Sequence, residues 1–321
     1  MPTAIKVTEL HKTYGKGKNA FEAVKGISLE IMEGELFGFL GPNGAGKTTS
    51  LKMMVGLLDP TDGTAEILGM DPRRSKQDLK RQIGIIPQDI SIYEELTVLE
   101  NLRFMAKAYK VPKEDYEPRI TALVAQIGLV EKQNTRAKAL SGGQKRRLNL
   151  IMGLVHDPKI VLCDEPTPGL DPQSRVVVWD FLNDLCKKEG KTVVLTTHFM
   201  EEADRLSDRV AIIDHGQILV VDQPFKLKSS VGEGDLLELD IDDHDRFEEA
   251  LNAVEDGQFE GMEEIVVRSN RLLVRCQNVV PKISDILNQI EEKGINIVNM
   301  SLRSTTLEDV FISLTGRSLR D

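Results

Sequence analysis

The chain has 321 residues, enough for two domains, and a formal net charge of −10. Residues 225–321 are the acidic part, with 20 Asp+Glu against 11 Lys+Arg, and neither part has the basic excess that nucleic acid binding requires. Three widely spaced cysteines, Cys163, Cys186 and Cys276, form no Cys-x-x-Cys pair, which argues against a disulfide or zinc framework.

Residues 1–224 alternate between strand and helix patterns. Ala4–Leu10 and Gly26–Ile31 alternate apolar and polar residues, as strands exposed on one face do. Short apolar runs indicate strands buried on both faces, and these are Leu36–Gly41, Ile83–Gln88, Lys159–Glu165, Lys191–His198 and Arg209–Asp214. We therefore predict an α/β fold with a mostly parallel central sheet and an antiparallel β subdomain.

A helical insert interrupts this pattern. Residues 97–130 have apolar residues at helical spacing, and Thr97-Val-Leu-Glu100 fits the capping box that starts a helix. We place the whole insert at about residues 89–145.

The pattern changes again after Asp222. Residues 225–321 read as strand, helix, two strands, helix and strand, the order of a ferredoxin-like α+β domain. An amphipathic helix over residues 305–316 is expected to close the domain. We predict a linker at about residues 223–234.

The stretch GPNGAGKTT fits the phosphate-loop pattern G-x-x-x-x-G-K-[ST] between a predicted strand and a predicted helix. Its backbone N–H groups and the helix dipole are suited to hold a β-phosphate. Lys47 is expected to bridge the β- and γ-phosphates, and Thr48 to ligate Mg²⁺. The candidate binding residues of this loop are Gly41, Asn43, Gly44, Ala45, Gly46, Lys47, Thr48 and Thr49.

Polar residues follow several of the buried strands. Asp164 and Glu165 end one of them, at the edge where such sheets bind ligands. We expect Asp164 to hold Mg²⁺ through water and Glu165 to accept a proton from the water that attacks the γ-phosphate. Gln88 and His198 end two further strands and reach the same edge if the strands are parallel. Taken alone, an acidic pair is more often a helix cap, but the phosphate loop favours catalysis.

A second glycine-rich stretch, ALSGGQKRR, begins at Ala139 and lacks the lysine of a complete phosphate loop. Ser141 is expected to cap the helix that follows, so that a hydroxyl, N–H groups and the helix dipole face an anion. The candidate binding residues here are Ser141, Gly142, Gly143 and Gln144. For Lys145, Arg146 and Arg147 we predict a solvated basic face.

Seven elements in order, Tyr14, GPNGAGKT, Gln88, LSGGQ, IVLCDE, GLD and His198, resemble the ATP-binding subunit of an ABC transporter. The resemblance covers residues 1 to about 224 and implies a P-loop ATPase core that uses ATP and Mg²⁺. It also implies that two subunits face each other head to tail, so that the LSGGQ of one closes over the ATP of the other. The second glycine-rich stretch would then complete the ATP site of the partner subunit, which explains why it lacks a lysine of its own.

The resemblance implies individual roles as well. Tyr14 stacks on adenine, although by itself it reads as a loop aromatic, and Gln88 senses Mg²⁺ and the γ-phosphate. Glu165 is the general base, Asp171 lies in a loop at the dimer interface, and His198 contacts the γ-phosphate. Two mild departures from the family pattern, Cys163 and Pro168, affect no ligand-binding role.

The expected partners are a second copy of the chain, or a paralogous ATPase subunit, and an integral membrane permease that docks on residues 89–104. The ending of residues 307–316 resembles extensions on ATPases of drug, lipid and polysaccharide exporters. With no apolar run of the ~18 residues that span a membrane, we expect a peripheral protein on the cytoplasmic face of the cell membrane. The alternative is a non-transport ABC ATPase in DNA maintenance or translation, but those carry two cassettes or a long coiled-coil insertion.

Overall fold

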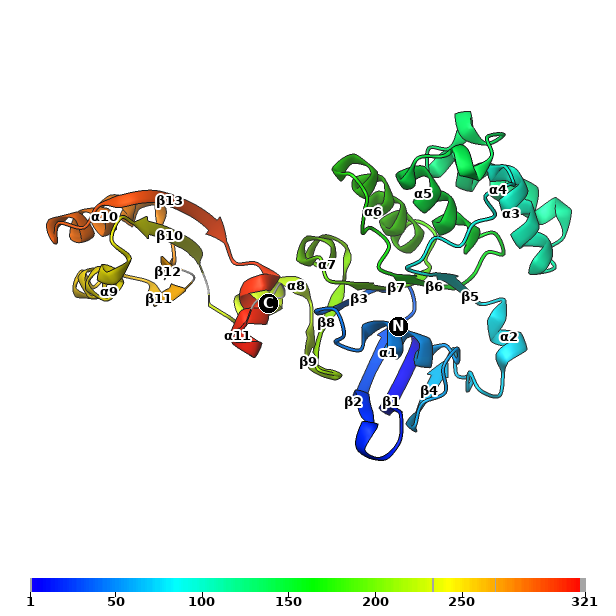
Figure 1. Cartoon of the computed structure of the whole chain (residues 1–321), viewed down its shortest axis with the longest axis horizontal. Helices are drawn as coiled ribbons and strands as arrows, with labels where there is room; N and C mark the ends of the chain where they lie inside the picture. The colour runs from blue at the N-terminus through cyan, green and yellow to red at the C-terminus, as the bar shows by residue number, and fades with distance from the viewer. Residues whose placement is uncertain (1, 233, 269, 318–321) are drawn as a thin grey trace. The chain divides into compact units, whose positions relative to one another are not determined.

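The computed structural model describes residues 2–232, 234–268 and 270–317. Its chain divides into two compact units between Pro224 and Phe225 (Figure 1). Among the described residues, no helix combines the length and the apolar character that crossing a membrane demands.

The first unit is organised around a six-stranded sheet of order β5-β6-β7-β3-β8-β9. Its five strands from β5 to β8 are mutually parallel, and only β9 is antiparallel, which confirms the predicted parallel core. The strands are β3 (Leu36–Leu40), β5 (Ile83–Ile86), β6 (Ile160–Asp164), β7 (Thr192–Thr197), β8 (Arg209–Asp214) and β9 (Gln217–Asp222).

Both faces of this sheet are covered, because alternate residues of each strand point into different cores. In β6, Val161 and Cys163 belong to a core shared with helices, while Ile160 and Leu162 belong to a core shared with the second sheet. Burial on both faces explains why these strands read as continuous apolar runs.

The helical side of the unit contains α3, α4, α5 and α6 (Figure 1). Helix α3 begins after Thr97, whose side chain and that of Glu100 form the predicted capping box. The helices of the first unit are α1 (Lys47–Met54), α2 (Lys76–Lys80), α3 (Val98–Ala108), α4 (Lys113–Gln126), α5 (Gly142–Met152), α6 (Pro172–Lys187) and α7 (Met200–Leu206), with short 3-10 turns at Gly17–Asn19, Val130–Lys132 and Ala137–Ala139.

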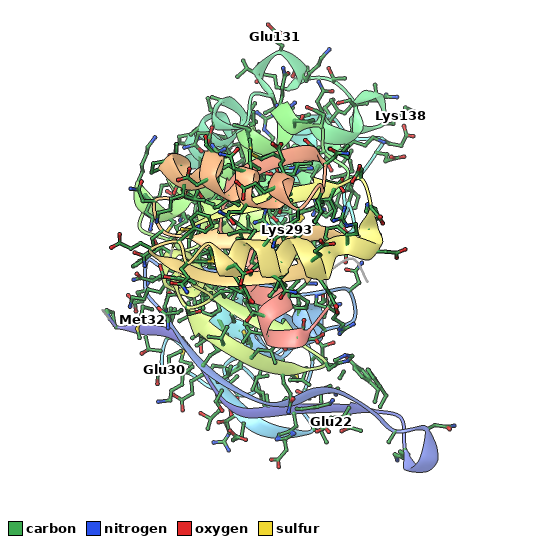
Figure 2. The ribbon with its side chains drawn as sticks, turned by 90° about the vertical axis from the view of Figure 1, so that its left-hand side faces the viewer. Glu22, Glu30, Met32, Glu131, Lys138 and Lys293 are labelled. Carbon is green, nitrogen blue, oxygen red and sulfur yellow. The ribbon has the colours of Figure 1, made fainter. Side chains whose placement is uncertain are left out.

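An antiparallel sheet of order β2-β1-β4 packs on the opposite face of the central sheet. It consists of β1 (Thr3–Tyr14), β2 (Phe21–Met32) and β4 (Asp62–Ile67). Figure 2 labels three residues along β2, namely Glu22, Glu30 and Met32. Glu30 pairs with Lys6 of β1 at 2.7 Å on the exposed side of this sheet, while Ile5 and Phe37 lie in the core beneath it.

The second unit has the predicted ferredoxin-like order. Its antiparallel sheet runs β11-β12-β10-β13, with two helices inserted between strands as expected. Its strands and helices are β10 (Asp235–Ile241), α9 (Phe247–Asp256), β11 (Met262–Arg268), β12 (Arg271–Cys276), α10 (Ile283–Glu292), β13 (Ile297–Ser304) and α11 (Leu307–Thr315), with 3-10 turns at His244–Arg246 and Val280–Lys282.

The segment predicted as a linker is not irregular throughout. Helix α8 (Pro224–Ser229) occupies its first half. Leu227 is 2 % exposed, so burial of this side chain stabilises a helical turn where only a connection was expected.

Candidate functional site

Four strands deliver polar residues to one edge of the central sheet. Because β3, β5, β6 and β7 are parallel, the residues that follow them emerge at the same edge. The register places Leu40 beside Thr197, and Asp164 beside Thr196. The structure therefore gathers the phosphate loop, Gln88, the acidic pair and His198 at one place, as the parallel strands required.

The phosphate loop connects β3 to α1 and depends on two glycines that have no room for a side chain. A Cβ at Gly41 would lie 2.1 Å from the carbonyl oxygen of Ile213. Gly46 has φ +100°, and a Cβ there would lie 2.6 Å from the carbonyl oxygen of Ala23. The loop is thus pressed against neighbouring backbone and leads into the N-terminus of α1, where the helix dipole favours an anion.

Lys47 begins α1 and is 5 % exposed. Its Nζ donates hydrogen bonds to the carbonyl oxygens of Gly41 at 2.7 Å and Pro42 at 3.0 Å, and lies 3.6 Å from Glu165 Oε1. Burial lowers the pKa of the Lys47 ammonium, and the nearby Glu165 carboxylate opposes this effect. A buried ammonium held at the mouth of a phosphate loop is suited to bind phosphate oxygens.

The Thr48 hydroxyl and the Asp164 carboxylate form an oxygen-rich pair. Thr48 Oγ1 donates to Asp164 Oδ1 at 2.7 Å, and Thr196 Oγ1 donates to the same oxygen at 2.7 Å. A cavity of about 200 Å³ adjoins this pair and is also lined by Gln88. Hydroxyl, carboxylate and amide oxygens are the ligands that Mg²⁺ prefers, so these residues fit a magnesium-bound phosphate.

Glu165 has a backbone conformation that non-glycine residues rarely adopt, with φ +47°. Its N–H donates to Thr196, to the hydroxyl at 3.0 Å and to the carbonyl oxygen at 3.2 Å. Its side chain is buried, with Oε2 3.2 Å from His198 Nδ1. Such strain persists only where surrounding contacts impose it, and it is common at catalytic positions.

The sequence analysis missed Thr196, although this residue contacts both members of the acidic pair. The available signal was its place two residues before His198, in a strand parallel to the one that ends in Asp164. Thr196 is fully buried, and its hydroxyl fixes the backbone of one carboxylate residue and the side chain of the other.

Tyr14 and Asp171 are exposed, and their local contacts explain their positions without a nucleotide. Lys12 Nζ lies 5.4 Å from the centre of the Tyr14 ring, at the end of β1. The Asp171 carboxylate caps α6 by accepting the Ser174 N–H at 2.9 Å, and this hydrogen bond lowers the pKa of Asp171. Their roles toward adenine and across a dimer interface stay predictions.

The second glycine-rich loop starts α5 in the predicted way. Ser141 Oγ accepts the Gln144 N–H at 3.3 Å, and Gln144 Oε1 accepts the Ser141 N–H at 3.0 Å, which confirms the helix cap. Apart from the neighbouring backbone of α5 itself, no atom of the described residues lies within 4 Å of a Cβ built at Gly142, whereas one at Gly143 would lie 3.0 Å from Ser174 Oγ. Across the described part of the chain, no hydrogen bond or ion pair joins Ser141–Gln144 to the phosphate loop.

The prediction of a solvated basic face is wrong for Arg146, which is 4 % exposed. Its guanidinium donates to the carbonyl oxygens of Pro166 at 2.8 Å and Pro87 at 3.1 Å, and also to those of Gln88 and Glu165. Helical spacing could have revealed this, because Arg146 shares a face of α5 with the buried residues Asn149 and Leu150. Arg147 instead donates to the Ile127 carbonyl oxygen at 3.0 Å.

Comparisons with known proteins agree with this geometry. Residues 24–168 match the family model described as ABC transporter. The linearmycin resistance ATP-binding protein of Bacillus subtilis is 33 % identical, over 99 % of this chain and 100 % of its own length. The Nod factor export ATP-binding protein I of Ralstonia nicotianae is 34 % identical, over 99 % of this chain and 95 % of its own length.

Solved structures show the same cassette. A dimeric ATP-binding cassette in a post-hydrolysis state, bound to ADP and Pi, is 28 % identical with a TM-score of 0.63, over 68 % of this chain and 98 % of that one. The phosphate loop and the acidic pair meet at the edge of the central sheet, and the similarity to the linearmycin resistance protein extends over 99 % of this chain. The chain therefore belongs to the ABC transporter family and is one of its ATP-binding proteins, an ATPase.

Proposed function

We propose that this chain is the ATP-hydrolysing motor subunit of an ABC exporter, that it binds MgATP between two head-to-tail subunits, and that it drives a separate membrane permease. The convergence of Lys47, Asp164 and Glu165 at one sheet edge carries the proposal. Residues 1–224 would be the ATP-binding domain and residues 225–321 an accessory domain.

The hydrolytic steps follow from the contacts of this site. Lys47 and the N–H groups of the phosphate loop bind and orient the β- and γ-phosphates. Glu165 accepts a proton from the attacking water, and His198, whose Nδ1 lies 3.2 Å from Glu165 Oε2, contacts the γ-phosphate. Gln88 reaches the same phosphate from the end of β5. Bound Mg²⁺, held by Thr48 and Asp164, would neutralise charge on the phosphate oxygens.

The second subunit is proposed from the structure of α5. Its N-terminus carries a Ser141 hydroxyl and an open surface at Gly142, which together offer an anion site, and within the described ranges no hydrogen bond or ion pair joins this site to the chain's own phosphate loop. A dimeric cassette of the same fold supports this arrangement. Ser141–Gln144 of one chain would then contact the γ-phosphate held by Lys47 of the other.

The permease is proposed to dock on residues 89–104. Three apolar side chains of this segment, Ile90, Tyr93 and Phe104, are exposed, and the rings of Tyr93 and Phe104 lie 4.6 Å apart. Glu94 pairs with Lys145 of α5 at 2.6 Å, and Glu95 pairs with Lys138 at 2.7 Å (Lys138 is labelled in Figure 2). Such a dock would place the chain on the cytoplasmic face of the membrane. The Glu94–Lys145 pair would connect the dock to α5.

The direction of transport is inferred from relatives. One is named for linearmycin resistance and another for Nod factor export, which favours an exporter. Purification of the tagged chain from solubilised membranes tests the proposal. An integral membrane protein should co-purify and change the ATPase rate of the chain, and Lys47→Ala should abolish that hydrolysis. Recovery with ribosomes or DNA in place of a membrane protein would contradict the proposal.

A further inference from the structure

Arg146 is a buried cation whose hydrogen bonds go to backbone carbonyl oxygens. Among the described residues no Asp or Glu forms an ion pair with it, and its N–H groups donate to backbone carbonyl oxygens. A buried charge is costly unless its hydrogen bonds are satisfied. The planar guanidinium satisfies this need with donors on several sides, which a lysine cannot reproduce.

The acceptors belong to two different loops. Pro87 and Gln88 follow β5, and their carbonyl oxygens accept from Nη1. Pro166 follows the acidic pair, and its carbonyl oxygen accepts from Nε at 2.8 Å, while that of Glu165 accepts from Nη2. The Arg146 side chain therefore joins the loop that contains Gln88 to the loop that contains Glu165.

Arg146 also completes the support of the strained Glu165 backbone. Thr196 accepts the Glu165 N–H on one side of the residue, and Arg146 donates to its carbonyl oxygen on the other. Removing the guanidinium would leave buried carbonyl oxygens in both loops without this donor. The left-handed conformation at Glu165 would then lose one of the contacts that impose it.

We infer that Arg146 is a positioning residue that couples Ser141–Gln144, here called the signature loop, to the two loops of the same chain that contain Gln88 and Glu165. Ser141 and Arg146 lie on one rigid helix, so a displacement of the signature loop moves the guanidinium and, with it, Gln88 and Glu165. This inference rests on the proposed function. There, Ser141 contacts the ATP of the partner, and Arg146 would thus link the two ATP sites of the dimer.

Arg146→Lys and Arg146→Met test the inference, with Arg147→Met as the matched control. Arg147 is the next residue on the same helix, but its hydrogen bond goes to Ile127 and not to either loop. We expect MgATP binding to stay within about twofold in all variants, because the phosphate loop does not contact Arg146. Turnover of both Arg146 variants should fall about 10- to 100-fold at unchanged KM, the effect expected of a displaced catalytic group.

The Hill coefficient for ATP hydrolysis distinguishes a positioning role of Arg146 from a role in protein stability alone. In the Arg146 variants the Hill coefficient for ATP hydrolysis should fall to about 1, whereas Arg147→Met should keep the wild-type coefficient and rate. Wild-type turnover and cooperativity in Arg146→Met, or equal losses in Arg147→Met, would overturn the inference. If Arg146→Met does not fold, as shown by its thermal melting, Arg146→Lys decides with the same readouts, because it retains the buried charge.

The proposed shared site is checked separately. Glu165→Gln protein should form a dimer on addition of MgATP, measured by sedimentation. A protein that stays monomeric contradicts the shared site itself. A dimer that forms equally in Arg146→Met/Glu165→Gln, together with slow and non-cooperative turnover of Arg146→Met, supports coupling through Arg146.

Discussion

Lys47 Nζ and Glu165 Oε1 lie 3.6 Å apart, although Lys47 begins α1 and Glu165 follows β6, and the two side chains have different proposed roles. The ammonium is placed to hold a phosphate, and the carboxylate to receive a proton from the water that attacks it. Because one side chain would serve ATP binding and the other turnover, changing one residue at a time should separate the two properties.

Glu165→Gln should retain MgATP binding and lose turnover by about 100-fold or more, because the amide keeps the shape of the side chain but cannot accept the proton. Steady-state phosphate release and equilibrium nucleotide binding measure the two effects. Lys47→Ala is the contrasting variant and should lose binding itself. Unchanged hydrolysis by Glu165→Gln would remove Glu165 from the catalytic role.

Thr196→Val should slow turnover about tenfold and lower the free energy of unfolding by ~1–3 kcal/mol, because two buried hydrogen bonds to the acidic pair are lost. The matched control is Thr192→Val in the same strand, where the hydroxyl accepts the Gly34 N–H at the far end. The control should lose stability but keep its turnover. Equal turnover in both variants would show that Thr196 does not position the site.

Mixing two inactive variants should restore one complete ATP site if the sites are shared. Lys47→Ala disables the phosphate loop, and Gly142→Asp places a carboxylate where the partner's γ-phosphate would sit. Gly142 is preferred to Gly143 because, in the described part of the chain, a Cβ added there meets no atom within 4 Å beyond the backbone of its own helix, so the variant should fold normally. The readout is ATP retention after subunit exchange, with Glu165→Gln in both chains.

In that experiment the mixture should retain ATP at up to one site per mixed dimer, well above either variant alone. Exchange is verified independently with two differently tagged chains. Retention at the level of the separate variants, with exchange verified, means that the signature loop acts within its own chain.

The proposed permease dock predicts that its apolar contacts matter more than its charges. Tyr93→Ser with Ile90→Ser should weaken permease binding while basal ATPase stays near the wild-type rate, because both side chains are exposed on the surface. Val130→Ser is the control, an exposed apolar residue elsewhere in the helical region. Co-purification of the permease gives the measurement, and binding that is equal in all three proteins places the dock elsewhere.

His156 predicts a loss of stability in mild acid. Burial lowers the pKa of this imidazole from 6.5 to about 4, and its Nε2 lies 3.0 Å from the Ile83 carbonyl oxygen. Between these values the unfolded chain binds the proton and the folded chain does not, so stability falls as pH drops from about 6.5 to 4. The full loss is about 3 kcal/mol.

His156→Phe tests this prediction, since a phenyl ring can keep the stacking on Tyr109, whose ring centre lies 3.7 Å away. Denaturant unfolding at several pH values should show a shallower dependence for this variant between pH 4 and 6.5. The same slope in both proteins would assign the acid sensitivity to other groups.

Much of the fold could be predicted because burial on both faces leaves a direct trace in the sequence. The runs that became β3, β6 and β7 are buried along their whole length and rich in apolar residues, and a parallel sheet then places the residues that follow them at one edge. The Thr97 and Ser141 caps were also predictable, because each depends on side chains only three residues apart. These features are local, so sequence determines them directly.

Contacts between distant segments had no such trace. In the sequence Arg146 stands between two other cations, a pattern that favours a solvated face. In the fold, backbone carbonyl oxygens of two remote loops surround its guanidinium. The Thr196 hydroxyl likewise acquired its importance from Asp164, which lies 32 residues away in the chain. Only the tertiary structure decided these roles, because a hydrogen bond between remote residues depends on how strands and helices pack and not on the pattern within any one of them.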